Sequence, residues 1–191
     1  MKQICSVLIL LLSIGLKAQM SQQNEKPTFS SINSIGFVSG STGDNFIVQT
    51  INGIKYKKWN VGIGTGIDWY GVRSVPLVLD ARRNFTHHRH QPFIYANGGF
   101  SFTWANGSLA PSYYSTKIDY KNTYCYETGA GYNIAFKNKT ALVLSVGYSY
   151  KLASFDQYYN VIYDIGSGNV NLKNTYDYNY RRIAVRVGLQ F

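Results

Sequence analysis

The C-terminal end of the chain alternates strictly between apolar and polar or small side chains. Every second residue from position 183 onward is apolar: Ile183, Val185, Val187, Leu189 and Phe191. The residues between them are alanine, arginine, glycine and glutamine. Because successive side chains of a β-strand point to opposite faces, residues 181–191 are predicted to form a strand with one wholly apolar face.

The same period of two recurs along the rest of the chain. It is clear in residues 61–70, 74–85, 122–136 and 140–152, and it is less regular in residues 30–40, 44–56 and 92–104. Apolar residues at every second position predict strands, because a helix would repeat them every three or four residues. The first of these segments, 30–40, alternates most weakly. Together with the C-terminal segment, the pattern predicts eight strands.

The lengths of the predicted strands and of their connections favour a membrane barrel. Most strands have about ten residues, the length that a tilted strand needs to cross a bilayer. Short connections lie near 57–60, 86–91 and 137–139, whereas residues 104–122 and 154–181 form long ones. Barrels in membranes have short periplasmic turns and longer outside loops, and an even strand number places both long connections outside. The predicted fold is all-β: an eight-stranded antiparallel up-and-down transmembrane β-barrel.

The polar face of the predicted strands carries glycine together with charged residues. The charged ones are Asp68, Asp80, Arg82, Glu127, Lys151 and Arg186. A narrow barrel interior needs small residues beside large ones, and buried charges must be paired because desolvation costs several kcal/mol. The sequence therefore predicts a charge network that fills the lumen. A narrow ion path lined by the same groups is the alternative.

Aromatic residues gather near the ends of the predicted strands. Those assigned to the membrane interface are Trp59, Trp69, Trp104, Tyr148 and Tyr150. Aromatic rings favour the boundary between lipid and water, where an apolar body and a polar tip are both satisfied. A secreted soluble barrel is the other interpretation, with its apolar face inward around a hydrophobic ligand.

The N-terminus predicts export. Residues 1–19 combine a lysine, a short apolar run and a small residue near a plausible cleavage point, as in a secretory signal peptide. Residues 20–191 are then the barrel domain. Removing Lys2 and Lys17 with the signal lowers the net charge from +10 to about +8. The cations are scattered, so we expect contacts with outer-membrane lipids and lipopolysaccharide rather than with nucleic acid.

The chain resembles the small eight-stranded outer-membrane β-barrels of Gram-negative bacteria, the OmpA-like and PorT-like barrels. The resemblance rests on the signal peptide, RSVPLVLDARRNF followed by QPFIYANGGFSF, the strands TGAGYNIAF and LSVGYSY, and the terminal RIAVRVGLQF. It implies a protein of the cell outer membrane. It also implies that Phe191, as an aromatic last residue, is read as an assembly signal by the barrel-assembly machinery.

One segment invites a chemical interpretation. THHRH, residues 86–90, holds three histidines that could bind a transition metal. No nearby cysteine or carboxylate completes a site, so we predict a solvated basic turn without metal or cofactor. All three histidines fall in that turn and no G-x-S-x-G segment is present, so catalysis is not expected.

The long connections leave room for a binding role. Residues 104–122 and 154–181 are rich in Tyr, Asn and Ser, a composition that suits adaptable recognition. The sequence predicts a monomeric barrel with a structural or surface-recognition role, whose extracellular loops at these ranges contact a ligand. The alternatives are strands that continue above the membrane, a narrow ion channel, and the soluble ligand-binding barrel.

Overall fold

The computed structural model describes residues 26–41, 43–69, 72–86, 89–104, 115–136, 140–162 and 169–191. The predicted signal peptide lies outside the described residues. The described residues form nine strands: β1 (Thr28–Gly40), β2 (Gly43–Tyr56), β3 (Trp59–Asp68), β4 (Ser74–Asn84), β5 (His90–Thr103), β6 (Ser115–Lys121), β7 (Thr123–Ala135), β8 (Ala141–Ile162) and β9 (Asn169–Gln190). In this part of the chain, no helix is long and apolar enough to span a membrane.

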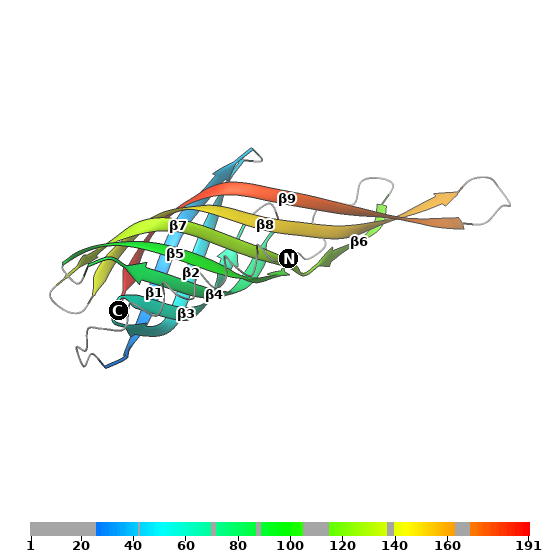
Figure 1. The fold of residues 1–191 in the computed structure, drawn as a ribbon. Coiled ribbons are helices and arrows are strands. Elements are labelled where there is room, and N and C mark those ends of the chain that lie inside the picture. Colours follow the sequence, from blue (N-terminus) through cyan, green and yellow to red (C-terminus); the bar gives the residue numbers. More distant parts are fainter. Residues whose placement is uncertain are drawn as a thin grey trace, which may run out of the picture.

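Eight of the nine described strands close into a barrel (Figure 1). Each pairs antiparallel with its neighbour, and the ring closes where Ile32–Ser39 of β1 pairs with Ile183–Gln190 of β9. The backbones of Ser31 and Phe191 also exchange two hydrogen bonds, of 3.1 and 2.9 Å. β6 is separated from β7 by one residue and pairs with β8 outside the ring. The predicted fold, with its eight strands, is confirmed.

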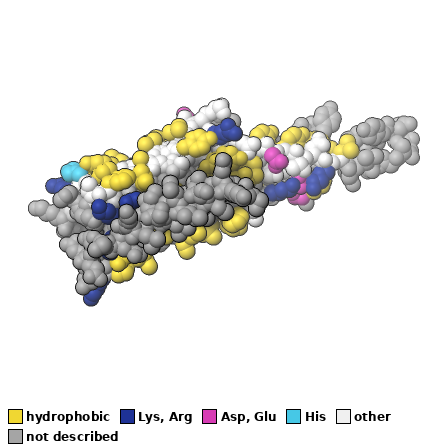
Figure 2. Space-filling view, viewed as in Figure 1, with side chains coloured by type: hydrophobic (Ala, Val, Ile, Leu, Met, Phe, Trp, Pro, Cys, Tyr) yellow, Lys and Arg dark blue, Asp and Glu magenta, His cyan; other side chains and the backbone are white. Residues whose placement is uncertain are grey.

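The barrel is apolar outside and largely polar inside. Exposed fractions reach 67% for Leu79 and 58% for Ile63, whereas Asp80 and Glu127 are only 2% and 4% exposed. On the face seen in Figure 2, many hydrophobic side chains lie on the visible outer wall, and most visible charged side chains lie toward the ends and on the ribbon. A soluble barrel around a hydrophobic ligand would need the opposite arrangement, so that alternative is wrong for this fold.

The predicted long loops are in large part strand. β8 and β9 stay paired from Ala141↔Gln190 to Ile162↔Asn169, far past the point where β1 leaves β9. β6 adds a third strand to this projection. We call these paired segments, 115–121, 154–162 and 169–181, the ribbon, and Figure 1 shows it projecting from one end of the barrel. The loop assignment is therefore corrected for residues 115–121, 154–162 and 169–181, where the alternative of continued strands holds. Residues 105–114 and 163–168 of the two predicted loops lie outside the described residues.

The two ends of the barrel differ. At the ribbon end, β1 and β2 meet across a hairpin in which Gly43 has a φ of 100°. At the opposite end, which we call the turn end, Phe191 lies beside the start of β1, and β2 and β3 are joined by a tight turn. Lys57 occupies that turn with a φ of 53°. A positive φ at the turn matches the strand twist in a two-residue hairpin.

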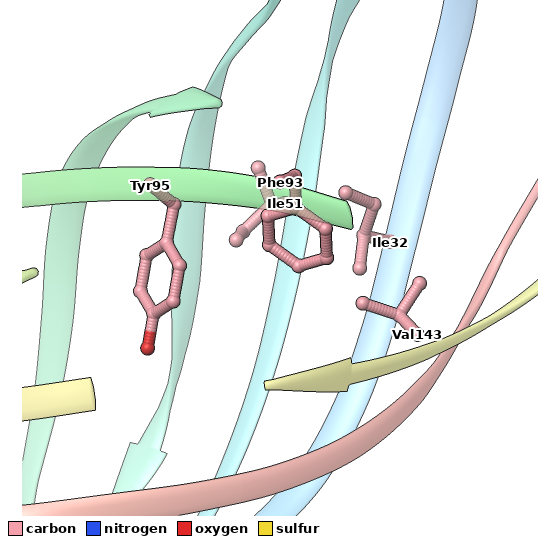
Figure 3. Packing of buried hydrophobic residues seen from close by; sticks show 5 residues of the cluster. All are labelled: Ile32, Ile51, Phe93, Tyr95 and Val143. Atoms are coloured by element: carbon pink, nitrogen blue, oxygen red, sulfur yellow. The ribbon is translucent and has the colours of Figure 1, made fainter. Parts of the chain in front are cut away.

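Part of the interior is apolar, which the sequence did not predict. Ile32, Ile51, Phe93, Tyr95 and Val143 form one buried cluster. Figure 3 shows Phe93 of β5 close to Ile32 of β1 and Ile51 of β2, which lie across the lumen, with Val143 of β8 beside them. These side chains fill the barrel cross-section between the polar groups described next.

Candidate functional site: the charged lumen

One charged cluster lies between β5, β7 and β9. Glu127 of β7 forms a two-point ion pair with Arg186 of β9, in which Arg186 Nη1 contacts Oε1 and Nη2 donates to Oε2 over 2.5 Å. Tyr95 of β5 donates its hydroxyl to Glu127 Oε1 over 2.6 Å. Both ionised side chains are almost fully buried, at 4% and 6% exposed. The fork geometry and the extra donor match what a buried ion pair requires to offset its desolvation.

A second cluster lies nearer the ribbon end. Lys151 of β8 approaches Asp68 of β3 at 2.6 Å between Nζ and Oδ1. Ser74 donates to the same carboxylate over 2.8 Å and accepts from Lys151 over 2.5 Å. Ser74 also shares a 2.8 Å hydrogen bond with Ser101. This cluster ties β3, β4, β5 and β8 together across the lumen.

The third pair lies within one strand. Arg82 donates from Nε to Asp80 Oδ1 over 2.8 Å, and the two residues share the inward face of β4 because they are two positions apart. The Arg82 guanidinium also lies 5.5 Å from the ring centre of Phe93 and 5.4 Å from that of Tyr95. Such cation–π contacts add to the pairing where water is excluded.

Two glycines make room for these aromatic rings. A Cβ atom on Gly147 would collide with the Tyr95 hydroxyl, and one on Gly131 would collide with the Phe93 ring. β7 and β8 therefore carry glycine opposite the two largest inward-facing side chains of β5. These contacts give the physical reason for the predicted mixture of small and large interior residues, because the glycines leave room for the aromatic rings.

One small cavity lies among the charges. A cavity of about 30 Å³ is lined by Asp68, Cys125, Glu127, Lys151 and neighbouring side chains. That volume is room for about one water molecule. The structure thus places all six charges of the predicted network inside the barrel and joins them as three ion pairs.

The sequence did not identify the neutral partners of the charges. Tyr95 and Ser74 make direct hydrogen bonds to charged groups, Ser101 shares a hydrogen bond with Ser74, and Phe93 lies beneath the Arg82 guanidinium. The alternation of the strands did indicate that these residues face inward. Ser74 is an even number of positions from Asp80 on β4, and Tyr95 is two positions from Phe93 on β5. Choosing Tyr95 required knowing that β5 and β7 are neighbours, which follows only from the pairing register.

The five predicted interface aromatics lie on the outer surface in two groups. Trp59 begins β3 at the turn end, under the guanidinium of Arg83 at 5.5 Å. Trp69 and Trp104 follow β3 and β5 towards the ribbon end. Tyr148 and Tyr150 lie on β8, and Tyr150 stacks on Tyr126 at 4.9 Å between ring centres. This arrangement is typical of the two aromatic girdles of a membrane barrel.

The histidine segment contributes one described residue to the fold. His90 begins β5, is exposed, and lies 5.9 Å from the ring of Tyr132. His87 and His88 lie outside the described residues. Across the described ranges, no group of three His, Cys, Asp or Glu side chains is placed to hold a metal ion.

The ribbon has two unlike faces. The inward parity of β8 continues into an aromatic face formed by Tyr120, Phe155, Tyr176, Tyr178 and Tyr180, whose neighbouring ring centres are 5.5–6.3 Å apart. On the other face Asp156 meets Lys121 and Lys173, each at 2.9 Å. Cross-strand pairs of both kinds stabilise a sheet, so the ribbon can persist without a core of its own.

The charged face makes the ribbon sensitive to acid. Hydrogen bonds from Lys121, Thr175 and Lys173 hold the pKa of Asp156 well below its ordinary value of about 3.9. When folding lowers the pKa of a carboxyl group, the ionised group stabilises the folded state at any pH above its ordinary, unfolded pKa. This stabilisation is lost as the pH falls from the unfolded pKa through the lower folded pKa. We expect the hydrogen-exchange protection factors of ribbon amides to be level from pH 7 to about 5 and to fall severalfold below about 4.

Two variants distinguish the contribution of Asp156 to the acid response of the ribbon from other effects of low pH. Asp156→Asn should lower ribbon protection at pH 7 and remove most of its pH dependence. Asp177→Asn, the same change on the same ribbon, is the matched control and should keep the acid transition. An identical pH profile in wild type and Asp156→Asn would contradict the assignment.

Comparison with known proteins agrees with the architecture. No protein-family model matches the chain, and no curated protein matches it in sequence. Among solved structures, the outer membrane protein OprG from Pseudomonas aeruginosa is similar, with a TM-score of 0.55 at 10% identity, covering 89% of this chain and 98% of that one. Neisserial surface protein A gives 0.46 at 14% identity (87% and 98% covered), and AlkL, solved in lipid bilayers, gives 0.47 at 13% (91% and 92%). The match with OprG shows that the fold is that of a small outer-membrane β-barrel.

Proposed function

We propose that this protein is an integral outer-membrane barrel whose lumen is closed by ion pairs and whose ribbon is a recognition surface outside the cell. The membrane placement rests on one observation: burial is the reverse of that in a soluble protein. Leucine, isoleucine and phenylalanine are exposed around the wall, and paired charges are buried within. Lipid is the solvent in which such a wall is stable. The fold shared with OprG supports the same placement.

The outer wall has a shape suited to lipid tails. A groove of about 660 Å³ crosses the wall from β7 over β8, β9 and β1 to β2. Its outward-facing lining side chains include Ile35, Phe37, Phe46, Tyr132, Leu144, Val146, Val185 and Val187. In water this hollow would expose a large apolar area, whereas lipid tails can fill it.

The interior favours a closed barrel over an ion channel. Three buried ion pairs and the apolar cluster around Phe93 occupy successive parts of the lumen. Eight strands leave an interior that side chains can fill completely. The expected conductance is accordingly close to that of the bare membrane.

The ribbon favours recognition as the task of the exposed end. Its tyrosines offer flat rings with polar tips, and Tyr178 is 44% exposed. Aromatic side chains with few rotatable bonds bind partners at low entropic cost. The assembly role of Phe191 is part of the same proposal: its ring is exposed on the outer wall, and its backbone pairs with Ser31.

The proposal is tested by gel migration and by conductance. In a washed outer-membrane fraction, unboiled and boiled samples should migrate differently, because a hydrogen-bonded barrel resists detergent until heated. Protein reconstituted in planar bilayers should show no steady ion current above background.

Either measurement can overturn its half of the proposal. A single band that stays in the aqueous fraction would rule out the membrane barrel. Stable unitary conductance steps would instead assign the lumen as a channel. Unfolded protein in the same bilayers is the control for leakage.

A further inference from the structure

A compact group of polar side chains interrupts the apolar outer wall on β1, β2 and β3. Its members, which we call the island, are Ser31, Asn33, Thr50, Asn52 and Thr65. The strand register makes them direct neighbours, since Ser31 pairs with Asn52, Asn33 with Thr50, and Thr50 with Thr65. Asn33, Asn52 and Thr65 are exposed, and the other two are half-buried.

The island lies within the apolar wall rather than at its rim. Its neighbours along the strands and across the register are Phe29, Ile35, Val48, Ile54, Ile63 and Leu189, all between 40% and 71% exposed. A ring of outward-facing apolar side chains therefore surrounds the polar groups. On the proposed membrane placement, these amides and hydroxyls face hydrocarbon.

The chain itself satisfies these groups poorly. Asn33 donates to Ser31 over 3.4 Å, which is long for a hydrogen bond. The Asn52 amide has no side-chain hydrogen bond to any described residue. An amide offers two donors and an acceptor, and lipid tails offer it no partner, so burial of these groups against another hydrogen-bonding surface is favoured.

We propose that the island is the contact surface between two copies of this chain in the membrane. Copies inserted in one direction hold their islands at one depth, so a two-fold axis along the membrane normal brings island to island. An asparagine amide is both donor and acceptor, so two identical amides complement one another, as an isologous interface requires. The small hydroxyl residues beside them let the walls approach closely, and the apolar ring packs around the contact.

A second copy fits this surface better than other occupants. The island and its ring are uncharged, so they offer nothing specific to a charged partner or a lipid headgroup. The inference rests on the membrane placement proposed above. It adds a contact between two chains that the alternation of the strands did not predict.

Cysteine cross-linking in intact membranes tests the contact. In a Cys125→Ser background, Asn52→Cys should give an oxidised product of twice the chain mass. Thr128→Cys is the matched control, because Thr128 is an exposed polar residue on the outer wall of β7, four strands from β2 in either direction around the ring. We expect a severalfold higher dimer yield at position 52. Equal yields, or a product with a different protein, would overturn the proposal.

A second variant keeps the test independent of folding. Asn33→Leu combined with Asn52→Leu makes the wall more apolar and should not hinder insertion. In mild detergent, the wild type should sediment as two chains and the double variant as one, both with the boiling-dependent gel shift. A wild type that sediments as a single chain while showing that shift would remove the dimer and leave the membrane barrel standing. Loss of the shift in wild type would remove both.

Discussion

Glu127→Ala should lower the free energy of unfolding by about 3–5 kcal/mol, because it leaves the Arg186 guanidinium buried without its counter-charge. The carboxylate accepts from two arginine nitrogens and from the Tyr95 hydroxyl, so three donors lose their acceptor at once. Urea-induced unfolding in lipid vesicles, followed by tryptophan fluorescence, measures the change.

Two comparisons identify the cause of this loss. Lys173→Ala breaks an ion pair on the ribbon, where the lysine side chain is 50% exposed and solvent screens the interaction, and should lower stability far less than Glu127→Ala. Replacing the whole cluster, with Glu127→Leu, Arg186→Met and Tyr95→Phe, should recover most of the stability, because no buried polar group is then left unpaired. A loss from Glu127→Ala no larger than that from Lys173→Ala would show that the pair does not hold the lumen together.

The alternation of side chains was enough to predict the strands and their faces. Residues 74–85 were expected as a strand, and β4 spans Ser74–Asn84 with strict alternation of burial. The weak alternation of residues 30–40 also has a physical reason, since the outward positions of β1 include Ser31 and Asn33 of the island. A strand with polar residues on both faces has no period of two to detect.

Partners could not be predicted from alternation because they depend on how the sheet closes. Asp80 pairs with Arg82 on its own strand, but Glu127 pairs with Arg186, 59 residues away. The apolar interior cluster was missed because β5 carries large side chains on both faces, with Phe93 buried and Ile94 exposed. Residues 154–181 were assigned as a loop and are rich in tyrosine and asparagine, whereas the aromatic residues within 154–159 and 172–181 in fact lie on paired strands.

Leu79→Arg is the sharpest test of where the outer wall lies. Leu79 is 67% exposed in the middle of β4 and pairs with Ile63, which is also exposed. In water, a surface substitution of this kind changes stability by no more than about 0.5 kcal/mol. At the centre of a bilayer, an arginine on the lipid face of a barrel costs about 2–4 kcal/mol. The variant should therefore insert poorly and unfold at lower urea concentration.

Leu172→Arg makes the same change on the ribbon and serves as the matched control. Leu172 is 42% exposed on β9, beyond the part of that strand that pairs with β1. If the ribbon projects into water and the wall faces lipid, only the variant at Leu79 loses stability. Equal, small effects would place both leucines in water, and equal, large effects would place the ribbon in the bilayer as well. The difference between the two variants therefore tests whether the membrane boundary lies between the barrel wall and the ribbon, because it compares one chemical change at two positions of one folded sheet.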